Sequence, residues 1–124
     1  MRVLEIGCGS GGAARLVANQ IAPGTILAID RSAHAIAKAQ AGSTEEIAAG
    51  VLRLRHVAVE DFALRPGDAP FDLAFAMRVG ALDGRHPELE AQALEHIAAA
   101  MTPEGRLFVD GGDTLREIVL PRGR

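Results

Sequence analysis

Aromatic residues and cysteines are scarce in this sequence of 124 residues, which has one cysteine, four phenylalanines and neither tryptophan nor tyrosine. The single cysteine, Cys8, excludes an intramolecular disulfide and a thiolate zinc cluster, and it indicates a reducing compartment. The shortage of aromatic rings argues against stacking platforms for single-stranded nucleic acid. The core must therefore be built from leucine, valine, isoleucine and many alanines.

Strong net charge and long apolar runs are also missing. The net charge of -3 and the pI near 5.8 offer no basic surface, so neither nucleic acid nor an anionic membrane is expected as a partner. The first residues carry no basic segment, long apolar stretch or cleavage site that would mark a signal peptide or a membrane span. We expect one domain over residues 1–124, in the cytoplasm, with a small molecule as its partner.

Short apolar runs alternate with segments of helical periodicity along the chain. Strands are predicted at residues 2–6, 25–29, 51–59, 71–77 and 106–109. Helices are predicted between them: one at 13–21 after the first strand, two at 32–40 and 43–49 after the second, and one at 87–101 after the fourth. This alternation predicts an α/β fold, a three-layer sandwich with a mostly parallel sheet. Arg53, Arg55 and His56 would be costly to bury on both faces, so their strand is expected at a sheet edge. Residues 115–120 supply one further strand at most.

Glycines and carboxylates gather where the predicted strands end. Glycines after a buried strand permit positive φ and close approach to a ligand, and the ends of parallel strands are where ligands bind in such sheets. The spacing Gly7-x-Gly9-x-x-Gly12 also matches the dinucleotide fingerprint, so by itself it does not separate NAD from other adenosine ligands. The carboxylate of Glu5 suits a cofactor with ammonium and sulfonium charges and would repel a pyrophosphate.

The ordered motifs resemble those of the class I S-adenosylmethionine-dependent methyltransferases of the small-molecule type. The first motif of that family, acidic-x-Gly-x-Gly-x-Gly, is matched by Glu5, Gly7, Gly9 and Gly11. The resemblance continues through residues 30–32, 59–62 and 71–76 and through Pro103-x-Gly105 before residues 106–109. It implies a Rossmann-like sheet of strand order 3-2-1-4-5, S-adenosylmethionine as the cofactor, and methyl transfer to a small-molecule acceptor.

Cofactor-binding residues follow from the same resemblance. It implies that Asp30 accepts hydrogen bonds from both ribose hydroxyls and that Glu60, or less favourably Asp61, accepts one from the adenine amine. Ala58 departs from the family, in which many members have aspartate, and this leaves the choice between Glu60 and Asp61 open. The full set of expected cofactor-binding residues is Glu5, Gly7, Cys8, Gly9, Gly11, Asp30, Arg31, Val59, Glu60, Asp61 and Ala76.

Catalytic residues are less well defined, because alignment of the acceptor with the methyl group and the sulfur is the main requirement of methyl transfer. His86 and Asp83 follow the fourth strand and are the candidates for accepting a proton from the acceptor, although a solvated histidine at a helix start is an equal alternative for His86. Cys8 is expected to be a packed residue and not a nucleophile. His34, His56 and His96 lack metal-ligand spacing, so no metal site is expected.

The chain is short for the family that it resembles. Members usually carry an N-terminal helical segment over the cofactor and a final antiparallel hairpin, so we expect truncation at both ends and the loss of most or all of that hairpin. An unpaired sheet edge would allow a homodimer. Three functions therefore stay open: an active methyltransferase, a domain that binds without turnover, and a dinucleotide-dependent oxidoreductase, against which Glu5 and Glu60 argue.

Overall fold

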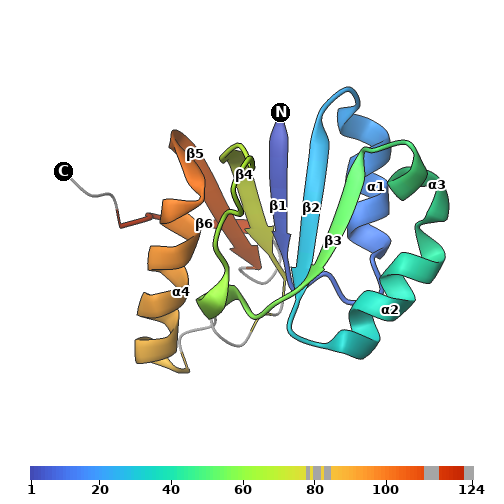
Figure 1. Cartoon of the computed structure of the whole chain (residues 1–124). Helices are drawn as coiled ribbons and strands as arrows, with labels where there is room; N and C mark the ends of the chain where they lie inside the picture. Colours follow the sequence, from blue (N-terminus) through green and yellow to red (C-terminus); the bar gives the residue numbers. More distant parts are fainter. Residues whose placement is uncertain (78, 80–81, 83–84, 111–114, 122–124) are drawn as a thin grey trace.

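A six-stranded sheet organises the computed structural model, which describes residues 1–77, 79, 82, 85–110 and 115–121. Its strands lie in the order β3-β2-β1-β4-β5-β6, and all neighbours are parallel except β5 and β6 (Figure 1). The predicted order 3-2-1-4-5 is confirmed, and β6 is the single strand expected beyond it. The strands are β1 (Arg2–Ile6), β2 (Thr25–Asp30), β3 (Leu52–His56), β4 (Phe71–Ala76), β5 (Met101–Asp110) and β6 (Leu115–Ile118).

Helices cover both faces of this sheet, as Figure 1 shows. One face carries α1 (Gly12–Ile21), α2 (Ala33–Gly42) and α3 (Thr44–Ala48), and the other carries α4 (Pro87–Ala99) and the short 3-10 helix η1 (Val59–Asp61). Ala14, Ala18 and Ala39 are fully or almost fully buried beneath the first group. Their small side chains let α1 and α2 lie close to the sheet, so alanine does replace aromatic volume in this core. No helix in the described part of the chain is both long and apolar enough to cross a membrane.

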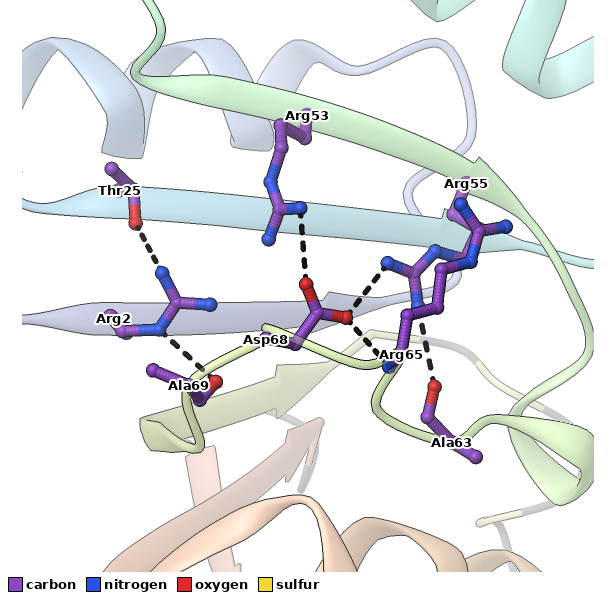
Figure 2. A network of polar contacts seen from close by, with 8 residues as sticks. All are labelled: Arg2, Thr25, Arg53, Arg55, Ala63, Arg65, Asp68 and Ala69. Atoms are coloured by element: carbon purple, nitrogen blue, oxygen red, sulfur yellow. Dashed lines mark hydrogen bonds and ion pairs between the residues drawn. The ribbon is translucent and has the colours of Figure 1, made fainter.

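The expected edge position of the arginine-bearing strand is confirmed, because among the described strands β3 pairs with β2 alone. Figure 2 shows the polar contacts that its arginines make with the loop before β4. The carboxylate of Asp68 lies 3.5 Å from Arg53 Nη1 and 3.2 Å from Arg55 Nη2, and it accepts a hydrogen bond of 2.8 Å from the Arg65 backbone N–H. These contacts, the backbone hydrogen bond first, lower the pKa of Asp68. The loop between η1 and β4 is thereby fastened to the sheet edge.

Two strand boundaries differ by three residues or more from those predicted. β3 ends at His56 and not at residue 59, because the Val57 N–H donates to the Asp30 carbonyl and the chain then turns into η1. β5 begins at Met101 and not at residue 106, because Met101 pairs with Phe71 before a shift in register. Residues 102–105, expected as a turn after the helix, therefore lie inside β5.

The carboxyl ends of the five parallel strands meet at one edge, which points downwards in Figure 1. The chain crosses from β1 outwards to β2 and β3 and then returns to the other side of β1 through β4. The order of the strands reverses between β1 and β4, and in open α/β sheets ligands bind in the crevice at that point. The candidate functional residues lie around this crevice.

Candidate functional site

The glycine turn after β1 is fixed against the end of β2. The N–H groups of Gly7 and Cys8 both donate to the Ile29 carbonyl, at 2.8 and 3.0 Å. Gly7 has a φ of +76°, and a Cβ there would lie 2.6 Å from Val79 Cγ2. A side chain at position 7 would therefore clash with the segment that follows β4, so glycine is required by both conformation and space.

Asp30 at the end of β2 holds the same turn by its side chain. Its Oδ2 accepts a hydrogen bond of 2.9 Å from the Gly9 N–H, and its Oδ1 accepts one of 2.8 Å from the Ser32 N–H. Ser32 in turn caps α2 by accepting a hydrogen bond from the Ala35 N–H. The carboxylate is thus fixed in orientation before any ligand binds. Each of its oxygens keeps further acceptor capacity for a ligand hydroxyl.

A pocket of about 200 Å³ lies between the glycine turn, the end of β2 and η1. Glu60 faces it from η1 and is 9% exposed, with Oε2 3.3 Å from Arg31 Nη2. Its Oε1 is buried and has no hydrogen-bond partner among the described residues. The lining residues are Ile6, Gly7, Gly9, Ile29, Asp30, Arg31, Val57, Val59, Glu60 and Val79.

Helix α4 fixes the turn that carries Glu60. Gln92 Nε2 donates to the Glu60 carbonyl at 3.0 Å, and His96 Nδ1 lies 2.7 Å from the Phe62 carbonyl. Because a carbonyl only accepts, His96 must carry a proton on Nδ1. This contact gives His96 a local structural role in holding the segment after η1. Neither Gln92 nor His96 was expected beside the site, since the pairing joins residues more than 30 positions apart.

Glu5 lies beneath the glycine turn in a nearly dry environment. It is 3% exposed, and its Oε1 has no hydrogen-bond partner in the described part of the chain. Burial, and secondly the negative charge of Asp30, raise the pKa of Glu5 to about 7. Burial and the same carboxylates raise the pKa of Cys8 to about 12, so its thiol stays protonated and is a poor nucleophile.

A second pocket, of about 400 Å³, adjoins the first at the ends of β4, β5 and β6. Its lining residues are Ala76, Val79, Leu82, Arg85, Val109, Asp110 and Arg116. Val79 lines both pockets. One row of residues in register runs across the sheet beneath them, through Ile29, Ile6, Ala76, Val109 and Arg116. Residues in register share a face of the sheet, so both pockets open on the α4 face along a single crevice.

The predicted cofactor-binding residues divide into three groups. Those that line the first pocket are Gly7, Gly9, Asp30, Arg31, Val59 and Glu60. Ala76 lines the second pocket instead. Those outside both linings are Glu5 and Cys8, buried under the turn; Gly11, the N-cap of α1; and Asp61, which is exposed. Between Glu60 and Asp61, the geometry favours Glu60. Sequence reasoning missed the apolar lining of Ile6, Ile29, Val57 and Val79.

Of the two candidate catalytic residues, the structure describes His86. His86 is exposed at the N-cap of α4 and makes no capping hydrogen bond with its side chain. Its neighbour Arg85 lines the second pocket, but His86 does not. Asp83 lies outside the described residues.

Comparison with known proteins identifies the family. Residues 4–107 match the methyltransferase domain family, and the chain belongs to it. Among curated protein sequences none matches the chain significantly. Membership confirms S-adenosylmethionine as the family's cofactor and the Rossmann-like fold, both predicted from the motifs.

Several solved structures share the fold over most of this chain. The [4+2]-cyclase SpnF is 29% identical with a TM-score of 0.72, and the match covers 87% of this chain and 37% of SpnF. An O-methyltransferase from a trans-AT PKS multienzyme of Brevibacillus brevis, in complex with S-adenosyl-L-homocysteine, is 12% identical with a TM-score of 0.73, covering 88% and 34%. An S-adenosylmethionine-dependent methyltransferase from Clostridium acetobutylicum ATCC 824 is 14% identical with a TM-score of 0.70, covering 87% and 41%. The chain thus spans well under half the length of each.

The residues present fit this cofactor. Glu5 and Glu60 each keep a buried carboxylate oxygen without a partner among the described residues, and an ionised carboxylate oxygen accepts hydrogen bonds. S-adenosylmethionine offers the matching donors, namely its ammonium and adenine amino groups. The open space at the position of a Gly9 Cβ also leaves the turn accessible to a ligand.

Proposed function

We propose that this chain binds S-adenosylmethionine in the pocket beside the glycine turn and transfers its methyl group to a small-molecule acceptor in the adjoining pocket. The observation that carries this proposal is the single crevice along one residue row, with Val79 lining both compartments. Methyl transfer requires the acceptor atom, the methyl carbon and the sulfur in one line, and two adjoining pockets on one face of a sheet supply that arrangement.

Each part of the cofactor has a proposed partner in the first pocket. Asp30, already oriented by the Gly9 and Ser32 N–H groups, accepts hydrogen bonds from the ribose hydroxyls. Glu60 accepts one from the adenine amine through its free Oε1, while Val59 packs on the ring and Arg31 flanks it. The glycine turn holds the methionine part over Glu5. Ala76 lies at the boundary with the acceptor.

The chemistry needs little from the chain beyond positioning. When bound, S-adenosylmethionine supplies a methyl group on a positively charged sulfur, from which an acceptor atom displaces it while the electrons of the broken carbon–sulfur bond stay on sulfur. Val79 lines both pockets and gives their boundary apolar surface, and Leu82 adds apolar surface to the second pocket, which disfavours water there. Asp30 and Glu60 would hold the nucleoside in the first pocket, which adjoins the pocket that Ala76 lines.

A domain that binds the cofactor fold without methyl transfer is the second candidate. The observation in its favour is the 29% identity with a structure whose name is that of a [4+2]-cyclase and not of a methyltransferase. The chain also spans only about a third of that protein. The oxidoreductase alternative is disfavoured by the family match and by the carboxylates around the pocket.

Calorimetric titration with S-adenosylmethionine, S-adenosylhomocysteine and NAD tests the binding step. We expect binding of both sulfur nucleosides and none of NAD, and tight NAD binding without either nucleoside would overturn the proposal. Transfer of an isotopically labelled methyl group to a panel of small acceptors then separates turnover from binding alone. An unchanged rate after His86→Ala would remove His86 as a proton acceptor.

A homodimer is part of the same proposal. The outer edges of β3 and β6 have no partner strand within the described residues. Light scattering of the purified chain at several concentrations tests the dimer, and a monomer mass throughout would contradict it.

A further inference from the structure

The two compartments of the crevice differ in the sign of their charge. Carboxylates prevail in the cofactor pocket, where Asp30 and Glu60 accompany a single guanidinium, that of Arg31. Among the described residues that line the adjoining pocket guanidinium groups prevail, because Arg85 and Arg116 accompany Asp110. Arg31 is moreover compensated by Glu60 at 3.3 Å. A cation is therefore favoured in the first pocket and an anion in the second.

Strand pairing positions the backbone of Arg116 beside this second pocket, and its side chain is exposed there. Arg116 pairs in register with Val109, which pairs with Ala76, so its side chain stands on the same face of the sheet as both. Within the described part of the chain, Arg116 has no ion-pair partner. Arg85 approaches the pocket from another element, the segment before α4, and it and Asp110 also interact with other groups of the chain.

The rest of the second pocket is apolar. Ala76 and Val109 form its floor on the sheet, and Val79 lines it on the side of the cofactor pocket, because Val79 also lines that pocket. Arg116 belongs to β6, which is farther along the sheet from β1 than the strands that carry Ala76 and Val109. β6 lies three strand positions from β1, roughly 14 Å at about 4.8 Å per strand.

We propose that the second pocket selects an acceptor that carries a carboxylate or phosphate group, anchored by Arg116 with Arg85. The planar guanidinium presents paired N–H donors that match both anions. The anionic group lies at the β6 end of the acceptor, and the methylated atom lies at the opposite end, beside Val79. This inference rests on the proposed function, since it names the acceptor class of that site.

Binding of four matched probes tests this inference: octanoate, octyl phosphate, 1-octanol and octylamine. They share an eight-carbon chain and differ in the head group, and binding is measured by ligand-observed NMR with the full chain, with and without S-adenosylhomocysteine. We expect octanoate or octyl phosphate to bind at least about tenfold more tightly than 1-octanol, and octylamine to bind most weakly. The ranking of the two anions identifies the preferred head group.

Arg116→Gln supplies the matched variant. It should weaken binding of the preferred anion about tenfold and leave the affinity for 1-octanol and for S-adenosylhomocysteine unchanged. Arg53→Gln, on the far edge of the sheet, serves as the control and should change neither. Equal binding of all four probes, or equal anion binding by the wild type and Arg116→Gln, would overturn the inference. Failure of S-adenosylhomocysteine to bind would instead count against the proposed function, because the anion preference is also measured without it.

Discussion

We predict that the buried carboxyl group of Glu5 makes cofactor binding depend on pH. Its pKa is raised from 4.5 to about 7, a difference worth about 3 kcal/mol at 1.36 kcal/mol per pH unit. This is the cost of ionising Glu5 in the folded chain without a neighbouring cation. Because the folded pKa exceeds the unfolded one, Glu5 stabilises the fold fully below pH 4.5, and that stabilisation is lost as the pH rises through about 7.

A cationic ligand favours the ionised form of Glu5 over the neutral form. The ammonium group proposed to lie above Glu5 interacts favourably with the ionised carboxylate and not with the neutral acid. Between pH 5.5 and pH 7.0 the ionised fraction of a group with a pKa near 7 rises from about 3% to about 50%, so the affinity for S-adenosylmethionine should rise roughly 15-fold. The ligand's own amino group, with a pKa near 7.7–8.0, stays protonated over this range.

Isothermal titration at pH 5.5, 6.2 and 7.0 measures the effect directly. Repeating it in two buffers with different heats of ionisation gives the number of protons released, which should approach one at pH 5.5 and fall towards one half at pH 7.0. Glu5→Gln keeps the size of the side chain without a titrating group, so its affinity should be low and independent of pH. A flat profile for the wild type, or the same slope in Glu5→Gln, would refute the assignment of Glu5 to the cation.

Three further predictions concern the turn, α4 and the sheet edge. Gly9→Ala and Gly50→Ala should each cost about 1–2 kcal/mol of stability, because both glycines have positive φ and open space at Cβ, but only Gly9→Ala should also weaken cofactor binding in calorimetry. Gln92→Leu should raise the Kd for S-adenosylhomocysteine about fivefold, from roughly 1 kcal/mol of lost hydrogen bonding to Glu60, with binding of the probe octanoate unchanged. Asp68→Asn should lower the free energy of unfolding by roughly 1–2 kcal/mol in urea at pH 7, and the difference should fade below pH 4, where the carboxyl of the wild type protonates.

The cofactor half of the crevice could be predicted from the sequence because its signals are local. The glycine turn and Asp30 stand directly after buried apolar strands, and that position is what marks them. The strand predicted at residues 51–59 is longer than β3. Val57 and Val59 are apolar, as strand residues often are, but they line the pocket instead of extending β3. An apolar run alone does not distinguish these two uses.

Contacts between distant segments account for what the sequence did not reveal. Gln92 and His96 lie on a helix whose periodicity is set by its buried face, including Ala93 and Ile97, so nothing local marks their contacts with the turn of Glu60. The start of β5 was missed because the pairing of Met101 with Phe71 overrides the turn preference of the proline and glycine that follow. Both the contacts of α4 with the turn of Glu60 and the start of β5 therefore depend on pairing between segments distant in the sequence.

The pocket proposed for the acceptor is harder to infer from the sequence than the pocket proposed for the cofactor. The cofactor pocket is built on β1, β2 and η1, whose residues fall within motifs of fixed spacing. The second pocket, which we propose for the acceptor, owes its positive charge to Arg85 and Arg116, which belong to separate segments; Arg116 is placed there by the pairing of β5 with β6. A family can therefore keep the first pocket and vary the second by changing single residues along one row of the sheet, because the scaffold that aligns the two is set by backbone pairing.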